Sequence, residues 1–66
     1  MTLEQLRSNR GMTQQALAEA IGWSHTNISA LEHGKRSISG LTMATAIKLS
    51  KALHITLDEL SRVKQP

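Results

Sequence analysis

Residues 13–31 read TQQALAEAIGWSHTNISAL, and this stretch decides the fold. Thr13 and Ser24 each stand before a short run of residues with helical apolar spacing, and Ser and Thr are favoured at the N-cap of a helix. A glycine separates the two runs. The stretch therefore predicts helices over residues 14–20 and 25–33, joined by a turn of three or four residues, which is the outline of a helix-turn-helix.

The second of these helices has an unusual outer face. Ile28 and Leu31 are its large apolar residues and are expected to fix it to the core. A helix exposed only for solubility would carry Lys and Glu, yet residues 24–31 contain neither. Short polar side chains such as Asn, Thr and His can reach base edges in the major groove of DNA. The pattern predicts a helix that reads DNA, with an outer face formed by His25, Thr26, Ser29, Ala30 and His33.

Further helices are predicted on both sides of this pair. The chain has one Trp and neither Phe nor Tyr, so residues that favour strands are scarce and an all-α domain is expected. Residues 35–41 are predicted to form a loop, and the 64–66 tail is expected to fray. The three remaining helices are 3–9, 43–53 and 57–62, capped by Thr2, Thr42 and Thr56.

The totals set limits on the function. The 66 residues are expected to form one domain, 1–66, with the helix-turn-helix at 13–33. Cysteine is absent, which excludes disulfides and thiolate metal sites. Eight Lys and Arg face five Asp and Glu, and a net charge of +3 favours a polyanionic partner. No apolar run is long enough to span a membrane, so a cytoplasmic protein without membrane partners is expected.

Five motifs in chain order carry a resemblance to a known family. They are LEQLR at 3–7, TQQALA at 13–18, IGWS at 21–24, NISALEHGKR at 27–36 and KALHITLDEL at 51–60. Together they resemble the lambda-repressor-like (Xre/Cro) helix-turn-helix domains over about residues 2–61. The resemblance implies a bacterial or phage-encoded five-helix domain whose third helix is the recognition helix. The stretch after Gly34 is longer than in the phage repressors and lacks their proline, which leaves the placement of Lys35 and Arg36 open.

The resemblance also implies roles for individual residues. Arg7 and Glu32 match the family's internal ion pair between the first and third helices, and Arg7 lies on the apolar face of its helix. Asn27 could reach either a base or a phosphate. Bases would be contacted by His25, Thr26, Asn27 and Ala30, and phosphates by Thr13, Gln14 and His33. Lys35 and Arg36 are expected to contact phosphates because of their positive charge and their place beside this helix.

We expect sequence-specific binding of double-stranded DNA by a homodimeric repressor, and neither enzymatic activity nor a cofactor. Leu57, Leu60 and Val63 are spaced to lie along one side of the last helix and are expected to form the dimer interface on a near-palindromic operator. The alternative is a protein-interaction module of the same fold, such as an antitoxin with a toxin partner. The two functions are compatible, because antitoxins of this family also bind DNA.

Other patterns favour structural explanations. The three histidines lack the spacing of a metal site. His54 is expected at the end of a helix, where a charged imidazole would be stabilised by the helix dipole. Trp23 precedes an N-cap and is predicted to pack with Ile28 as a hydrophobic staple. Asp58 and Glu59 lie in the first turn of a helix, where negative charge is favoured without any catalytic role.

Overall fold

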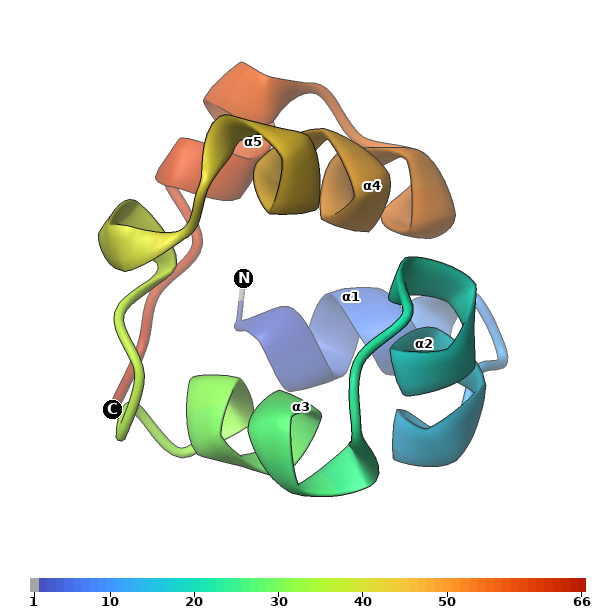
Figure 1. Cartoon of the computed structure of the whole chain (residues 1–66). Helices are drawn as coiled ribbons and strands as arrows, with labels where there is room; N and C mark the ends of the chain where they lie inside the picture. The colour runs from blue at the N-terminus through green and yellow to red at the C-terminus, as the bar shows by residue number, and fades with distance from the viewer. Residues whose placement is uncertain (1) are drawn as a thin grey trace.

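The computed structural model describes residues 2–66, which form an all-α domain of five α-helices and one short 3-10 helix (Figure 1). The predicted fold class is confirmed. Helix ends differ from the prediction by one residue in three helices. The elements are α1 (Leu3–Asn9), α2 (Gln14–Ile21), α3 (His25–Glu32), η1 (Ile38–Gly40), α4 (Met43–Leu53) and α5 (Leu57–Ser61).

All five α-helices begin with the side-chain cap that the sequence predicts. Each cap hydroxyl accepts a hydrogen bond from the backbone N–H three residues later, which satisfies a donor that the helix itself leaves free. In α1 and α5 the side chain of the third helical residue also accepts a hydrogen bond from the backbone N–H of the cap residue, so both helices have full capping boxes. The caps are Thr2, Thr13, Ser24, Thr42 and Thr56.

The first four α-helices end in the same way, at a residue in the left-handed conformation. After α2, Gly22 has a φ of 74°, and the backbone N–H of Trp23 donates to Ala18 at 2.8 Å. This pattern is a Schellman motif, which satisfies carbonyls at the helix end and turns the chain sharply. The corresponding residues after α1, α3 and α4 are Gly11, Gly34 and His54.

His54 is the one non-glycine residue with positive φ among residues 2–66. Its ring Nε2 lies 3.0 Å from the guanidinium of Arg10. The predicted position of His54 at the end of its helix is confirmed, and the ring also joins the ends of α1 and α4. Its contact with the helix dipole stays a prediction.

The core lies at the centre of the helices and takes buried residues from each of them. Ala18 is fully buried in α2, which packs against both α3 and α4. Trp23 is half-buried and packs against the same core, as expected for a staple residue. Figure 1 shows α3 along one edge of the domain, opposite α4 and α5, so the outer face of α3 is left open. The core residues are Leu3, Leu17, Ala18, Ile21, Ile28, Leu31, Leu49, Leu53 and Leu60.

The segments outside the α-helices are more ordered than predicted. The 35–41 loop contains η1, and Ile38 and Leu41 pack against the core. The prediction of a frayed 64–66 tail is wrong, because Gln65 forms three hydrogen bonds to backbone groups and Lys64 pairs with the start of α1. None of the helices among residues 2–66 is long and apolar enough to cross a membrane.

Candidate nucleic-acid interface

The exposed face of α3 carries no negative charge. His25 and Thr26 are exposed in its first turn, and Ala30 is half-buried on the following turn. Glu32 is the acidic residue of this helix, and its side chain is only 1% exposed. The face left to solvent is therefore polar and free of carboxylates that would repel a phosphate backbone.

The N-termini of α2 and α3 lack the acidic residues that two other helices place there. α1 has Glu4 in its first turn and α5 has Asp58 and Glu59, whereas the first turns of α2 and α3 contain none. A helix N-terminus carries partial positive charge and free N–H groups, so an anion is favoured beside it. In α2 and α3 this position is available to a group from outside the protein.

An open polar hollow of about 530 Å³ lies at the start of α2. It brings Thr13 and Gln14, both predicted phosphate contacts, beside His25, a predicted base contact. These residues come from two helices that the tight turn at Gly22 holds together. The complete lining is Arg7, Ser8, Gly11, Met12, Thr13, Gln14, Gln15 and His25.

A buried ion pair between Arg7 and Glu32 lies beneath the start of α2. Arg7 Nε donates to Glu32 Oε2 at 2.6 Å, and the exposed fractions of the two side chains are 14% and 1%. Arg7 Nη1 also donates to the Met12 carbonyl at 2.8 Å. The amide of Gln14 donates to Glu32 Oε1 at 2.8 Å. One carboxylate thus connects α1, α2 and α3, and part of the Gln14 side chain is held inside the protein, a contact that the sequence did not indicate.

The loop after α3 is positioned by an aromatic contact that sequence reasoning missed. The guanidinium of Arg36 lies 4.6 Å from the centroid of the Trp23 ring, within the range of a cation–π interaction. Lys35 and Arg36 remain exposed. The His33 ring folds back along α3, with Nδ1 2.8 Å from the Ser29 carbonyl. Because that carbonyl only accepts, Nδ1 donates and the other ring nitrogen is left for an outside partner.

The three residues expected at the dimer interface line one groove but differ in exposure. Leu57 is 41% exposed, Val63 is half-buried, and Leu60 is 2% exposed. Leu60 therefore belongs to the core, while its remaining surface lines the same groove, and its expected role at a dimer interface stays a prediction. Helical spacing identified residues on nearby faces of α5 but could not show which face the other helices cover.

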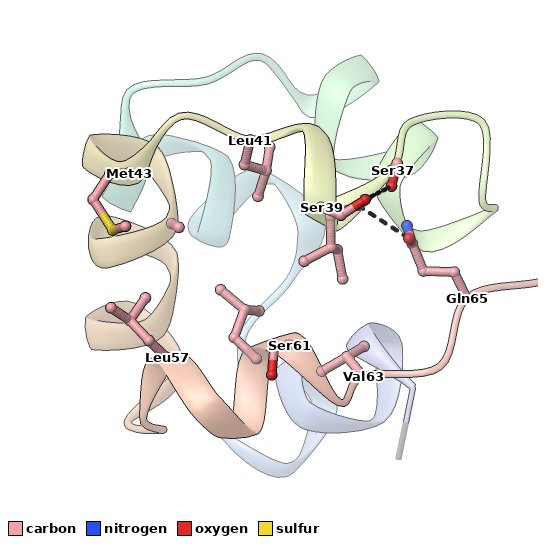
Figure 2. A pocket seen from close by; sticks show the side chains of 11 residues that line it. Ser37, Ser39, Leu41, Met43, Leu57, Ser61, Val63 and Gln65 are labelled. Carbon is pink, nitrogen blue, oxygen red and sulfur yellow. Dashed lines mark hydrogen bonds between the residues drawn. The ribbon is translucent and has the colours of Figure 1, made fainter.

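An apolar groove of about 440 Å³ lies next to these residues (Figure 2). Met43 is 68% exposed at its edge, and Leu57 and Val63 contribute further apolar surface. The groove runs between η1, the start of α4 and α5, away from the outer face of α3. Its lining is Ser37, Ile38, Ser39, Leu41, Met43, Ala46, Leu57, Leu60, Ser61, Val63 and Gln65.

The chain is similar to known proteins at the level of both sequence and structure. The helix-turn-helix family model matches residues 3–60. The solved structure of the restriction-modification controller protein C.AhdI from Aeromonas hydrophila is 31% identical and superposes with a TM-score of 0.75, covering 88% of this chain and 83% of that chain. No curated protein matches the sequence. The family model matches almost the whole chain, and the exposed face of α3 is free of acidic side chains. The protein therefore belongs to the lambda-repressor-like helix-turn-helix family of DNA-binding, transcription-regulating domains.

Proposed function

We propose that the protein is a sequence-specific, bacterial or phage-encoded repressor that binds a near-palindromic operator as a homodimer. The observation that carries the proposal is the outer face of α3. His25 and Thr26 are exposed at its start, its one carboxylate is buried under Arg7, and the adjoining helix N-termini have no acidic residue. A helix of this kind fits the major groove, where base edges are read.

Base reading and phosphate binding are divided between different parts of this surface. The first turn of α3 enters the groove, so the hydroxyl and methyl groups of Thr26 meet base edges. Phosphates lie at the N-terminus of α2 and beside the loop after α3, where they fix the position of the protein without carrying sequence information. Bases are contacted by His25, Thr26, Asn27 and Ala30, and phosphates by Thr13, Gln14, His33, Lys35 and Arg36.

A second copy of the chain covers the apolar groove. Exposed Met43 and Leu57 beside half-buried Val63 form an apolar surface on a small domain, and two-fold pairing through it places one α3 on each half of the operator. Bound DNA is then occluded from polymerase, which represses transcription. A monomer at the concentrations where DNA binds would contradict this arrangement and leave the groove to another protein, such as a toxin.

The structural neighbour favours one specific regulatory setting. C.AhdI is a restriction-modification controller protein, and its fold and 31% identity support control of restriction-modification genes as a candidate role for this chain. Genes for a nuclease and a methyltransferase next to the gene for this protein, with the selected binding site upstream of them, would support that role. A binding site remote from any such genes would count against it.

The test of the proposed function is selection of bound sequences from a random duplex library, followed by footprinting. We expect a near-palindromic site with two protected patches whose centres are about 10–10.5 base pairs apart on one face of the duplex. Affinity should fall steeply with salt because phosphate contacts release counterions. No binding to any duplex at low salt would overturn the proposal.

A further inference from the structure

The side chain of Gln65 holds the segment that follows the recognition helix. Its Nε2 donates to the Leu31 carbonyl at 2.9 Å and to the Arg36 carbonyl at 2.7 Å. Its Oε1 accepts from the Ile38 N–H at 3.0 Å. Both amide hydrogens and the carbonyl oxygen are therefore bonded to backbone groups, and Figure 2 shows Gln65 reaching toward this segment from the tail.

The three backbone groups bonded by Gln65 lie at the end of α3 and in the loop that follows it. Leu31 lies in the last turn of α3, where carbonyls lack partners within the helix. Arg36 belongs to the loop that carries the two exposed cations, and Ile38 begins η1. One side chain thus ties the end of the recognition helix to both ends of the loop segment 36–38.

The tail that carries Gln65 has a defined path of its own. Lys64 forms an isolated bridge with Thr2 at the start of α1. On the other side, the carbonyl of Pro66 occupies the place that a Cβ on Gly34 would need. The glycine after α3 therefore permits both the left-handed turn and the close approach of the tail, and these contacts hold the amide of Gln65 against the loop.

The backbone N–H groups of Lys35 and Arg36 also donate to the Ala30 carbonyl of α3, at 2.9 and 3.2 Å. We propose that Gln65 is a positioning residue for DNA binding, which adds to these bonds by holding the Arg36–Ile38 part of the loop to the end of α3. With the loop ordered in the free protein, both cations are placed for phosphates when α3 enters the groove, and less freedom is lost on binding. The stacking of Arg36 on Trp23 places the same loop from its other side. This inference rests on the proposed phosphate role of Lys35 and Arg36.

The test compares Gln65→Met with Ser50→Ala in the full chain. Methionine is similar in length to glutamine and uncharged, and it offers no amide group. Ser50→Ala removes a different side-chain bond to a backbone carbonyl, from Ser50 Oγ to Ile47 at 2.9 Å, within α4. A Lys35→Gln/Arg36→Gln variant gives the effect of losing the loop cations directly.

The readout is the slope of log affinity against log salt, measured on folded protein with one selected duplex. Each lost phosphate contact should reduce the magnitude of the slope by about 0.9. We expect Gln65→Met to lower affinity and reduce the slope by about one contact, while Ser50→Ala affects stability alone and leaves the slope unchanged. A purely structural role for Gln65 would change the melting temperature without changing the slope.

The outcomes separate this inference from the proposed function. If the wild-type protein binds no duplex, the proposed function fails. If the double loop variant keeps the wild-type slope, Lys35 and Arg36 do not contact phosphates and the role of Gln65 fails with them. If the loop variant loses slope but Gln65→Met keeps it, only the role of Gln65 is overturned. If Gln65→Met does not fold, Gln65→Asn serves the same test, because its shorter side chain cannot reach all three backbone groups. A Gln65→Asn protein with the wild-type salt slope would overturn the positioning role of Gln65.

Discussion

Removal of Arg7 should destabilise the domain more than any other single change on its polar side. In Arg7→Met the carboxylate of Glu32 stays 1% exposed and keeps one side-chain donor, the amide of Gln14. Stranding a buried charge in this way costs about 3–5 kcal/mol. Domains are stable by roughly 0.05–0.15 kcal/mol per residue, or about 3–10 kcal/mol for 66 residues. The substitution should therefore remove much of the folding free energy.

The opposite substitution should be milder. Glu32→Gln keeps the shape of the side chain and an acceptor for Arg7, whose guanidinium also bonds to the Met12 carbonyl and is 14% exposed. It loses the charge on the hydrogen bonds, which costs about 1–3 kcal/mol. The structure therefore predicts an order: wild type is most stable, Glu32→Gln is intermediate, and Arg7→Met is least stable.

Urea unfolding followed by circular dichroism and by Trp23 fluorescence measures these differences. At about 4–8 °C per kcal/mol for a domain of this size, Arg7→Met should also melt at least about 12 °C below wild type. The double variant Arg7→Met/Glu32→Leu should cost less than the sum of its single changes, since neither charge is then stranded. An Arg7→Met protein with the wild-type urea midpoint would refute this reasoning, as would additive effects in the double variant.

Three further predictions concern the surface and the helix ends. Leu57→Lys should abolish dimers in sedimentation experiments and leave the melting temperature nearly unchanged. Leu60→Ala, at a core site, should cost about 2–5 kcal/mol in unfolding free energy. If Leu57→Lys leaves the dimer intact and lowers the melting temperature instead, the groove is not the interface. Gly22→Ala should cost about 1–2 kcal/mol because its φ of 74° is left-handed, and unchanged stability would rule out strain at this turn. His54→Gly should change the unfolding free energy by less than about 1 kcal/mol. Glycine relieves the backbone strain at a φ of 57°, and this gain offsets the lost Arg10 contact and the added freedom of the unfolded chain. A larger loss in urea unfolding would show that the ring contact dominates.

The sequence predicted the features that depend on near neighbours. Thr2, Thr13 and Ser24 cap helices because the bonds they accept come from residues three positions away. Gly22 indicated the turn for the same reason, as its φ serves a motif closed within six residues. Together with the apolar spacing, these local signals were sufficient for an all-α helix-turn-helix.

Features that join distant parts of the chain were not predicted. Gln65 bonds to groups 27 and 34 positions away, at Ile38 and Leu31, so no local pattern could reveal it. Leu60 and Met43 both fit apolar helical spacing, but one is buried and the other is exposed. Spacing shows which residues share a helix face, while the packing of other helices decides whether that face is covered.

The ratio of specific to random DNA binding, measured at one fixed salt concentration, shows whether α3 reads DNA. Thr26→Ala should weaken the selected site by about 1–3 kcal/mol and spare random duplex, because a base contact carries sequence information. His25→Ala should behave in the same way. The control Lys35→Gln should weaken both duplexes alike and leave their ratio nearly unchanged. If Thr26→Ala and His25→Ala also leave the ratio intact, α3 is not the reading element and its assignment is contradicted.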